Sequence, residues 1–287
     1  MYRYISKHNT GGRLTYRDRG VRILTSDTEP LQKRLDFATE VAFEAGRLTL
    51  GYFQTNVRPE FKADDTPVTV ADREAEAMIR TAIKSRYPDH AIAGEEFGSE
   101  GPDGATHRWY IDPIDGTKAF VRGVPLYAVL IALEIEGAVR VGAAYFPALG
   151  EMISAADGLG CRWNGRLARV SEEPELSRSV ICFTETGTFE EEGKEERWSR
   201  LRSAAYSCRG WSDAYGHLLV ATGRVEAMVE PAMNPWDCAP FAPILREAGG
   251  YFGDWSGNGT IHENEAVSSN AAILPEVLRL LGDSATR

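Results

Sequence analysis

The chain has 287 residues, of which 43% are hydrophobic and 26% are charged, a balance typical of a globular protein with a sizeable core. Acidic residues outnumber basic residues by 42 to 32, for a formal net charge of -10. Because no long run of Lys or Arg lies in the body of the chain, nucleic acid is excluded as an expected partner.

No apolar stretch approaches the roughly 20 residues that a membrane helix needs, and the opening residues lack the apolar segment of a secretory signal. We therefore expect no membrane partner and a cytoplasmic location. The four cysteines are far apart and form no Cys-x-x-Cys pair, which favours free buried thiols in a reducing compartment.

The first helices are predicted well inside the chain. Residues 1–30 carry six Lys or Arg against three acids and show no sustained helical period. We expect an N-terminal extension outside the core fold, with an organelle transit peptide as the alternative.

Apolar residues recur on one face over residues 31–48, which predicts a helix. A second helix is predicted over about residues 70–86, with Thr69 as its N-cap and Pro88 beyond its end.

The rest of the chain predicts two sheets of different kinds. Two apolar runs, LYAVLIALEIEG and AVRVGAAYFP, are joined by Glu-Gly and predict neighbouring antiparallel strands. A hairpin within DGLGCRWNGRLARV continues this sheet. Further strands are predicted at 179–183, 225–230 and 251–255, and further helices at 213–222, 236–248 and 274–281. The fold class is therefore α/β, with an α+β half over residues 31–175 and an α/β half over residues 176–287.

The residues that can carry chemistry are acidic. Nucleotide-binding loops, the serine-hydrolase elbow and the zinc-protease motif are all absent. Two unit charges about 4 Å apart repel by about 4 kcal/mol at an effective dielectric near 20, so clustered acids need protons or cations. The candidate acids are Asp112 and Asp115 in WYIDPIDGTKAF, Glu95 and Glu96 in GEEFG, Asp72 in PVTVADREAE and Asp237 in NPWDCAP.

A set of carboxylates, a backbone carbonyl and waters suits Mg²⁺ or Mn²⁺. In Asp-Pro-Ile-Asp the two carboxylates can diverge toward two metal ions, and the carbonyl of Ile114 can face inward. Gly116 leaves room for backbone N–H groups to face a phosphate, and the hydroxyl of Thr117 can orient a metal-bound water. Simpler explanations remain open, because Asp-Pro and Asp-Gly are common in turns, Asp72 fits a capping box and Asp237 fits an N-cap.

Taken in order, GEEFG, WYIDPIDGTKAF and NPWDCAPFAPILREAGG closely resemble the motifs of the inositol monophosphatase family of Mg²⁺-dependent phosphatases, from about Leu31 to Leu281. The resemblance implies a layered α-β-α-β-α sandwich, two or three Mg²⁺ ions with Mn²⁺ as a possible substitute, inhibition by lithium, a small phosphorylated metabolite as substrate, and a homodimer. The metal ligands that it implies are Glu95, Asp112, the Ile114 carbonyl, Asp115 and Asp237, with Asp112 bridging two ions.

The same resemblance assigns the remaining catalytic roles. It pairs Thr117 with Asp72 to activate water, beside Glu95. Gly116 and Thr117 hold the phosphate through their backbone donors. Lys62 resembles a basic residue near a third, weaker metal position.

The substrate branch is read from the residues after the central motif. The stretch TKAFVRGVPLYAVLIAL, with SDAYGHLLVATG and MVEPAMNPWDCAP, looks most like the histidinol-phosphate phosphatase branch. A lysine after the threonine also occurs in the 3'(2'),5'-adenosine bisphosphate phosphatase branch. That activity and inositol-1-monophosphatase therefore remain the alternatives, and a phosphometabolite-binding sensor is the non-enzyme alternative.

Histidinol phosphate carries an ammonium and an imidazole, so its pocket should offer acids and an aromatic surface. Asp213, Tyr215 and Glu230 are the candidates for these contacts, with His217 nearby. Glu230 matches the position where inositol-specific relatives contact a sugar hydroxyl. The alternative is that Asp213 caps a helix and His217 belongs to its packing face.

Overall fold

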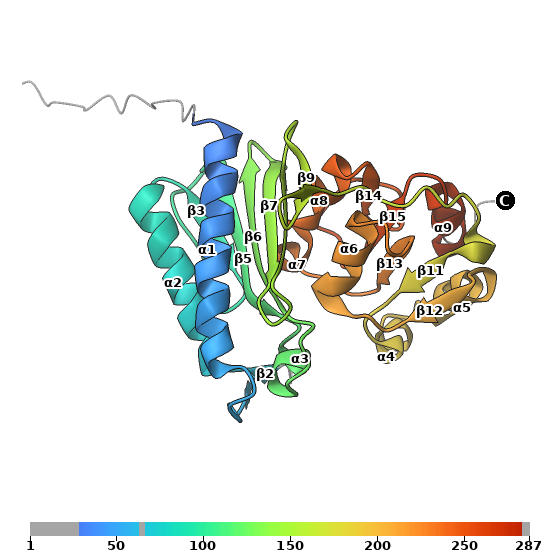
Figure 1. Ribbon diagram of the computed structural model, residues 1–287, viewed down its shortest axis with the longest axis horizontal. Helices are drawn as coiled ribbons and strands as arrows, with labels where there is room; N and C mark the ends of the chain where they lie inside the picture. Colours follow the sequence, from blue (N-terminus) through green and yellow to red (C-terminus); the bar gives the residue numbers. More distant parts are fainter. Residues whose placement is uncertain (1–28, 63–66, 283–287) are drawn as a thin grey trace, which may run out of the picture.

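The computed structural model describes residues 29–62 and 67–282. Residues 1–28 of the predicted extension lie outside the described residues. Figure 1 shows two sheets side by side, with helices on their outer faces and a further layer of helices between them. This is the predicted α-β-α-β-α sandwich. Among the described residues, no helix is both long and apolar enough to cross a membrane.

The first sheet carries the central motif. Its order is β10-β9-β8-β7-β6-β5-β3-β4, with β3 parallel to β5 and the other neighbours antiparallel. Its strands are β3 (Ala91–Gly94), β4 (Gly98–Glu100), β5 (His107–Asp115), β6 (Ala128–Ile135), β7 (Ala138–Phe146), β8 (Glu151–Ala156), β9 (Gly160–Trp163) and β10 (Arg166–Leu167). The elements around it are α1 (Leu31–Tyr52), α2 (Val70–Arg86), the short pair β1 (Glu60–Phe61) and β2 (Pro67–Val68), and α3 (Thr117–Val121).

The second sheet has the order β12-β11-β13-β15-β14. Strand β11 is parallel to β12 and β13, whereas β15 is antiparallel to β13 and β14. Its strands are β11 (Val180–Cys182), β12 (Ser207–Arg209), β13 (Ala227–Glu230), β14 (Gly250–Gly253) and β15 (Ala266–Asn270). Its helices are α4 (Thr186–Glu191), α5 (Glu195–Ala204), α6 (Asp213–Ala221), α7 (Pro235–Cys238), α8 (Phe241–Glu247) and α9 (Leu274–Leu281), with a 3-10 turn at Leu176–Arg178.

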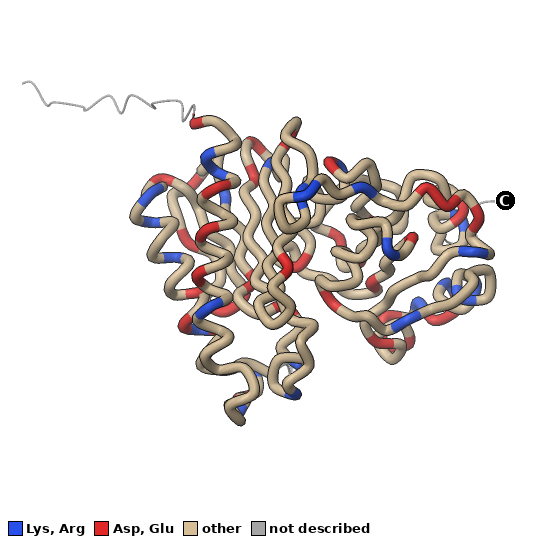
Figure 2. Tube along the Cα trace, viewed as in Figure 1, with Lys and Arg blue, Asp and Glu red and all other residues tan. Residues whose placement is uncertain are grey.

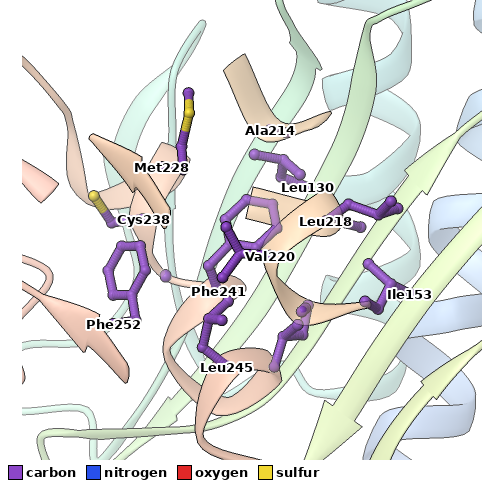
Figure 3. Close-up of a cluster of buried hydrophobic side chains, with 14 of the residues drawn as sticks. Leu130, Ile153, Ala214, Leu218, Val220, Met228, Cys238, Phe241, Leu245 and Phe252 are labelled. Carbon is purple, nitrogen blue, oxygen red and sulfur yellow. The ribbon is translucent and has the colours of Figure 1, made fainter. Parts of the chain in front are cut away.

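A shared hydrophobic core joins the two halves. Leu130 and Ile153 of the first sheet pack with Leu218 of α6 and Phe241 of α8, and Met228 of the second sheet belongs to the same cluster (Figure 3). Burial of this layer stabilises both sheets at once. Helices α6 to α8 belong to the layer between the sheets. The predicted division into two halves near residue 175 stays a prediction.

One predicted helix of the second half is wrong, and β12, β15, α4 and α5 were not predicted. The single helix predicted over residues 236–248 is wrong, since α7 ends at Cys238 and α8 begins at Phe241. Pro240 and Pro243 have no N–H to donate, so they interrupt the hydrogen-bond ladder that one continuous helix would need. Strand β15 was not predicted, because its sequence AVSSN has little apolar character although all five residues are buried.

Candidate active site

Asp112 and Asp115 lie at the end of β5, where the strand is irregular. Residues three apart in a regular strand point to opposite faces, but the pairing of β5 with β6 shifts register between these two aspartates. Such a bulge redirects side chains. Asp112 is only 2% exposed, and its Oδ1 accepts the N–H of Ile114 at 3.0 Å. The irregularity therefore lets both carboxylates serve one site.

Asp237 joins them from the second half. It lies in the first turn of α7, and its Oδ2 accepts the backbone N–H of Asn234 at 2.9 Å. Ligand oxygens of Asp112, Asp115 and Asp237 all lie within 4.8 Å of one another. Figure 2 shows acidic positions in red between the two sheets, close to α7.

Burial and mutual repulsion raise the pKa values of these carboxyls when no cation is bound. The pKa of Asp112 is raised well above its usual value by burial and then by the charges of Glu95, Asp115 and Asp237. Burial likewise raises the pKa of Asp237 to about 7, against the hydrogen bond from Asn234. A divalent cation would reverse this cost by stabilising the ionised form. The donors are all oxygens, so this cluster fits a hard cation such as Mg²⁺.

The GEEFG loop places Glu95 beside the cluster. The N–H of Glu95 donates to the carbonyl of Ile111 on β5 at 3.2 Å. Lys62 Nζ donates to Glu95 Oε1 and to Glu96 Oε1, both at 2.8 Å. Burial alone would lower the pKa of Lys62, but these hydrogen bonds raise it above its usual value. Burial raises the pKa of Glu96 to about 7, against the hydrogen bond from Lys62.

Two residues that sequence reasoning missed support this loop. Glu76 on α2 is fully buried, and its carboxylate accepts the N–H of Glu96 at 2.7 Å and that of Phe97 at 3.2 Å. Arg80 Nε donates to Glu76 at 2.7 Å. Asp72, Glu76 and Arg80 recur every four residues on the buried face of α2. Charged residues on an otherwise apolar stripe were the available signal.

Asp72 serves as a helix cap and as a partner of Thr117. Its Oδ2 accepts the N–H of Thr69 at 2.8 Å and the Thr69 hydroxyl at 2.6 Å. Its Oδ1 lies 3.4 Å from the Thr117 hydroxyl, which also lies 3.1 Å from the carbonyl of Ile114. The two explanations for Asp72 are therefore compatible, because each uses a different oxygen.

Gly116 is required by its backbone conformation and by its neighbours. It has φ 81° and ψ 41°, a left-handed conformation that glycine adopts without steric cost. A Cβ there would lie 3.0 Å from the carbonyl oxygen of Leu126 and 3.1 Å from Oδ2 of Asp213. The carboxylate of Asp213 therefore lies directly beside the predicted phosphate turn.

The predicted substrate residues fall into two groups. Asp213 belongs to the site, because the N–H of the next residue, Ala214, donates to Asp115 Oδ2 at 2.8 Å. Burial raises the pKa of Asp213 to about 6. Glu230 is buried at the end of β13, and burial raises its pKa well above the usual value. The Tyr215 hydroxyl instead lies 3.4 Å from Glu151, and its ring packs on Phe146.

His217 is fully buried in the packing face of α6. Its Nδ1 lies 2.6 Å from the Ser268 hydroxyl, and its ring stacks on Phe241 with centroids 4.7 Å apart. Burial lowers its pKa to about 3, so it is neutral at physiological pH. This environment agrees with the packing role that was the alternative for His217.

Comparison with known proteins decides the family. The model of the inositol monophosphatase family matches residues 30–284. The chain belongs to the inositol monophosphatase family. It is therefore a phosphatase, that is, a phosphoric monoester hydrolase. Enzymes of this family depend on metal ions and act on small phosphorylated substrates.

Relatives within the family include named phosphatases. The chain is 47% identical over 251 residues to a histidinol-phosphatase of Chlorobaculum parvum, covering 87% of this chain and 96% of that protein. It is 37% identical to a histidinol-phosphatase of Mycobacterium tuberculosis, covering 88% and 95%. The solved inositol monophosphatase of Anabaena (Nostoc) has a TM-score of 0.78 and 31% identity, covering 88% and 96%. The predicted family and layered fold are thus confirmed.

A cleft between the two halves of this family member lies away from the carboxylates. Its volume is about 500 Å³, and its lining includes Glu134, Arg140 and Arg246. Glu134 of β6 lies opposite Arg108 in the strand pairing, near the start of β5. The acidic cluster lies at the other end of β5. The candidate active site is therefore the carboxylate cluster and not this cleft.

Proposed function

We propose that the chain is a Mg²⁺-dependent histidinol-phosphatase that hydrolyses L-histidinol phosphate to L-histidinol and inorganic phosphate. The observation that carries this substrate is the 47% identity to a histidinol-phosphatase over 96% of its length. The geometry supports it, because the carboxylate of Asp213 lies beside Gly116 and would attract a cationic leaving group.

Two Mg²⁺ ions would be held by five groups, with a third, weaker position near Lys62 and Mn²⁺ as a substitute. When bound, the ions supply charge stabilisation at the phosphoryl oxygens and lower the pKa of a coordinated water. The proposed ligands are Glu95, Asp112, the carbonyl of Ile114, Asp115 and Asp237. Lys62 holds Glu95 in place through its 2.8 Å hydrogen bond.

The protein's own groups then bind and orient the reactants. Backbone donors of Gly116 and Thr117 hold the phosphate. The Thr117 hydroxyl, 3.4 Å from Asp72 Oδ1, orients the attacking water. Asp72 accepts a proton from that water, and the leaving oxygen takes a proton from solvent. Attack by water in line with the leaving oxygen needs no covalent enzyme intermediate.

The carboxylates of Asp213 and Glu230 face the leaving group in this proposal. An ammonium gains more from two acids in a partly buried site than a neutral sugar does. Tyr215 has no place in it, because its hydroxyl lies against Glu151. Inositol 1-phosphate and 3'(2'),5'-adenosine bisphosphate are the alternative substrates within the family.

Phosphate release from L-histidinol phosphate tests the proposal. We expect release that depends on Mg²⁺, stops with EDTA and is inhibited by Li⁺. Binding of L-histidinol phosphate without release at saturating Mg²⁺ would instead indicate a sensor. The homodimer and the cytoplasmic location stay predictions, and light scattering of the purified chain tests the dimer.

A further inference from the structure

A hydroxyl outside the carboxylate cluster connects the two proposed leaving-group acids. Thr184 follows β11, and Glu230 ends the neighbouring parallel strand β13. The Thr184 hydroxyl donates to Glu230 Oε1, and its oxygen accepts the N–H of Asp213 at 2.9 Å. A hydroxyl has one proton and two lone pairs, so one Thr184 side chain satisfies both partners at once.

Asp213 needs this support because its backbone is unusual. Its φ of 53° is left-handed, a conformation that is unfavourable for a residue with a Cβ. Two hydrogen bonds hold it, one from its own N–H to Thr184 and one from the N–H of Ala214 to Asp115 at 2.8 Å. The result is that the Asp213 carboxylate lies over Gly116.

We propose that Thr184 is a positioning residue for leaving-group selection, holding the carboxylates of Glu230 and Asp213 where a cationic leaving group meets them. This inference rests on the proposed function, since it explains how the site prefers an ammonium-bearing phosphomonoester. Thr184 acts through these two acids and does not itself contact the reacting atoms.

Thr184→Val is the direct test, because valine keeps the shape and removes the hydroxyl. It leaves the Asp213 N–H and the Glu230 carboxylate without this partner, so both acids lose their fixed orientation. Thr184→Ser retains the hydroxyl and should restore selectivity. Thr186→Val is the matched control, because Thr186 is exposed in the same segment.

The readout is the ratio of kcat/KM for L-histidinol phosphate to kcat/KM for p-nitrophenyl phosphate, whose leaving group has no cation. We expect Thr184→Val to lower this ratio by about tenfold, chiefly through KM for L-histidinol phosphate, as for loss of a hydrogen bond to a charged group. Thr184→Ser and Thr186→Val should keep it within about twofold of the wild type. If the valine variant does not fold, Thr184→Ala carries the same expectation.

An unchanged ratio in Thr184→Val, with both activities falling together, would show a merely structural role and overturn the inference. The wild type reports separately on the proposed function. If it releases phosphate from p-nitrophenyl phosphate and not from L-histidinol phosphate, the proposed substrate and the selection role of Thr184 both fail.

Discussion

Asp72, Asp112 and Asp237 are held by residues of their own turns, whereas Asp213 and Glu230 are held by a residue that is distant in the chain. In the first half, Asp112 accepts a hydrogen bond from the N–H of Ile114, two residues away. Asp72 accepts hydrogen bonds from the N–H and the hydroxyl of Thr69, three residues away. In the second half, Thr184 lies 46 residues from Glu230 and 29 residues from Asp213 in the chain.

This difference separates chemistry from selection. Asp72, Asp112 and Asp237 are each held within their own turn, so the conformation of each of these acids depends on local sequence. Acids held by distant partners depend on how the second sheet packs against α6. We therefore expect damage in the first group to abolish turnover and damage in the second group to change substrate preference.

The largest effect should come from Asp112→Asn. The amide removes one negative charge from the centre of the proposed metal cluster, so we expect kcat/KM to fall by more than about 10³-fold in saturating Mg²⁺. Steady-state kinetics checks this. Asp103→Asn, at an exposed loop aspartate, is the control, and wild-type activity in Asp112→Asn would remove Asp112 from the metal site.

Glu76→Ala tests a long-range support within the first half. It breaks a buried ion pair with Arg80 and removes the acceptor of two loop N–H groups, so we expect a loss of about 3 kcal/mol in the free energy of unfolding. The Mg²⁺ concentration for half-maximal activity should also rise, because Glu95 loses its fixed loop. Glu60→Gln, at an exposed ion pair, should change neither quantity, and equal effects in both variants would contradict this role for Glu76.

His217 gives the second half a pH dependence that lies outside the cluster. Burial lowers the pKa of His217 from 6.5 to about 3. Between these two pH values the imidazole is protonated in the unfolded chain and neutral in the folded chain. Stability from this group is present above pH 6.5 and is lost as the pH falls toward 3. Between pH 7 and 5 the loss is about 2 kcal/mol.

In urea unfolding, the free energy of unfolding should therefore fall by about 2 kcal/mol less from pH 7 to pH 5 in His217→Gln than in the wild type. His262→Gln is the matched control, because His262 is 60% exposed and should leave the dependence unchanged. An identical slope in His217→Gln and wild type would contradict the buried neutral imidazole.

The smallest effect is expected from Lys118→Ala. The direction of the change in KM distinguishes a cationic leaving group from an adenosine bisphosphate. Lys118 pairs with Glu185 at 3.1 Å, and both charges act on Asp213. Loss of this exposed cation should lower KM about twofold for a cationic leaving group and raise it for an adenosine bisphosphate, since exposed charges are screened. Arg122→Ala, at the end of α3, is the control, and a higher KM for L-histidinol phosphate in Lys118→Ala would count against a cationic leaving group.

The same difference between local and distant contacts explains what the sequence could predict. Helix 70–86 with its Thr69 cap, the antiparallel strands and the last helix follow from local periodicity and capping, and the structure has them at those places. Strand β15 and the break at Pro240 depend on partners across the fold or on competing local rules.

Within the site, the motif around Asp112 is local and could be predicted. The support from Glu76 and the contact of Thr184 with Glu230 join residues 20 and 46 positions apart, so no local pattern identifies the partners of these residues. Tyr215 is a candidate because the proposed pocket needs an aromatic surface, and the structure places its hydroxyl 3.4 Å from Glu151.

The most direct test of the account is a competition between equal concentrations of L-histidinol phosphate and inositol 1-phosphate in saturating Mg²⁺. The ratio of initial product rates equals the ratio of the two kcat/KM values. We expect L-histidinol to form at least about tenfold faster, with both reactions stopped by EDTA. Faster formation of inositol would contradict the proposed substrate, and turnover that persists in EDTA would contradict the metal cluster.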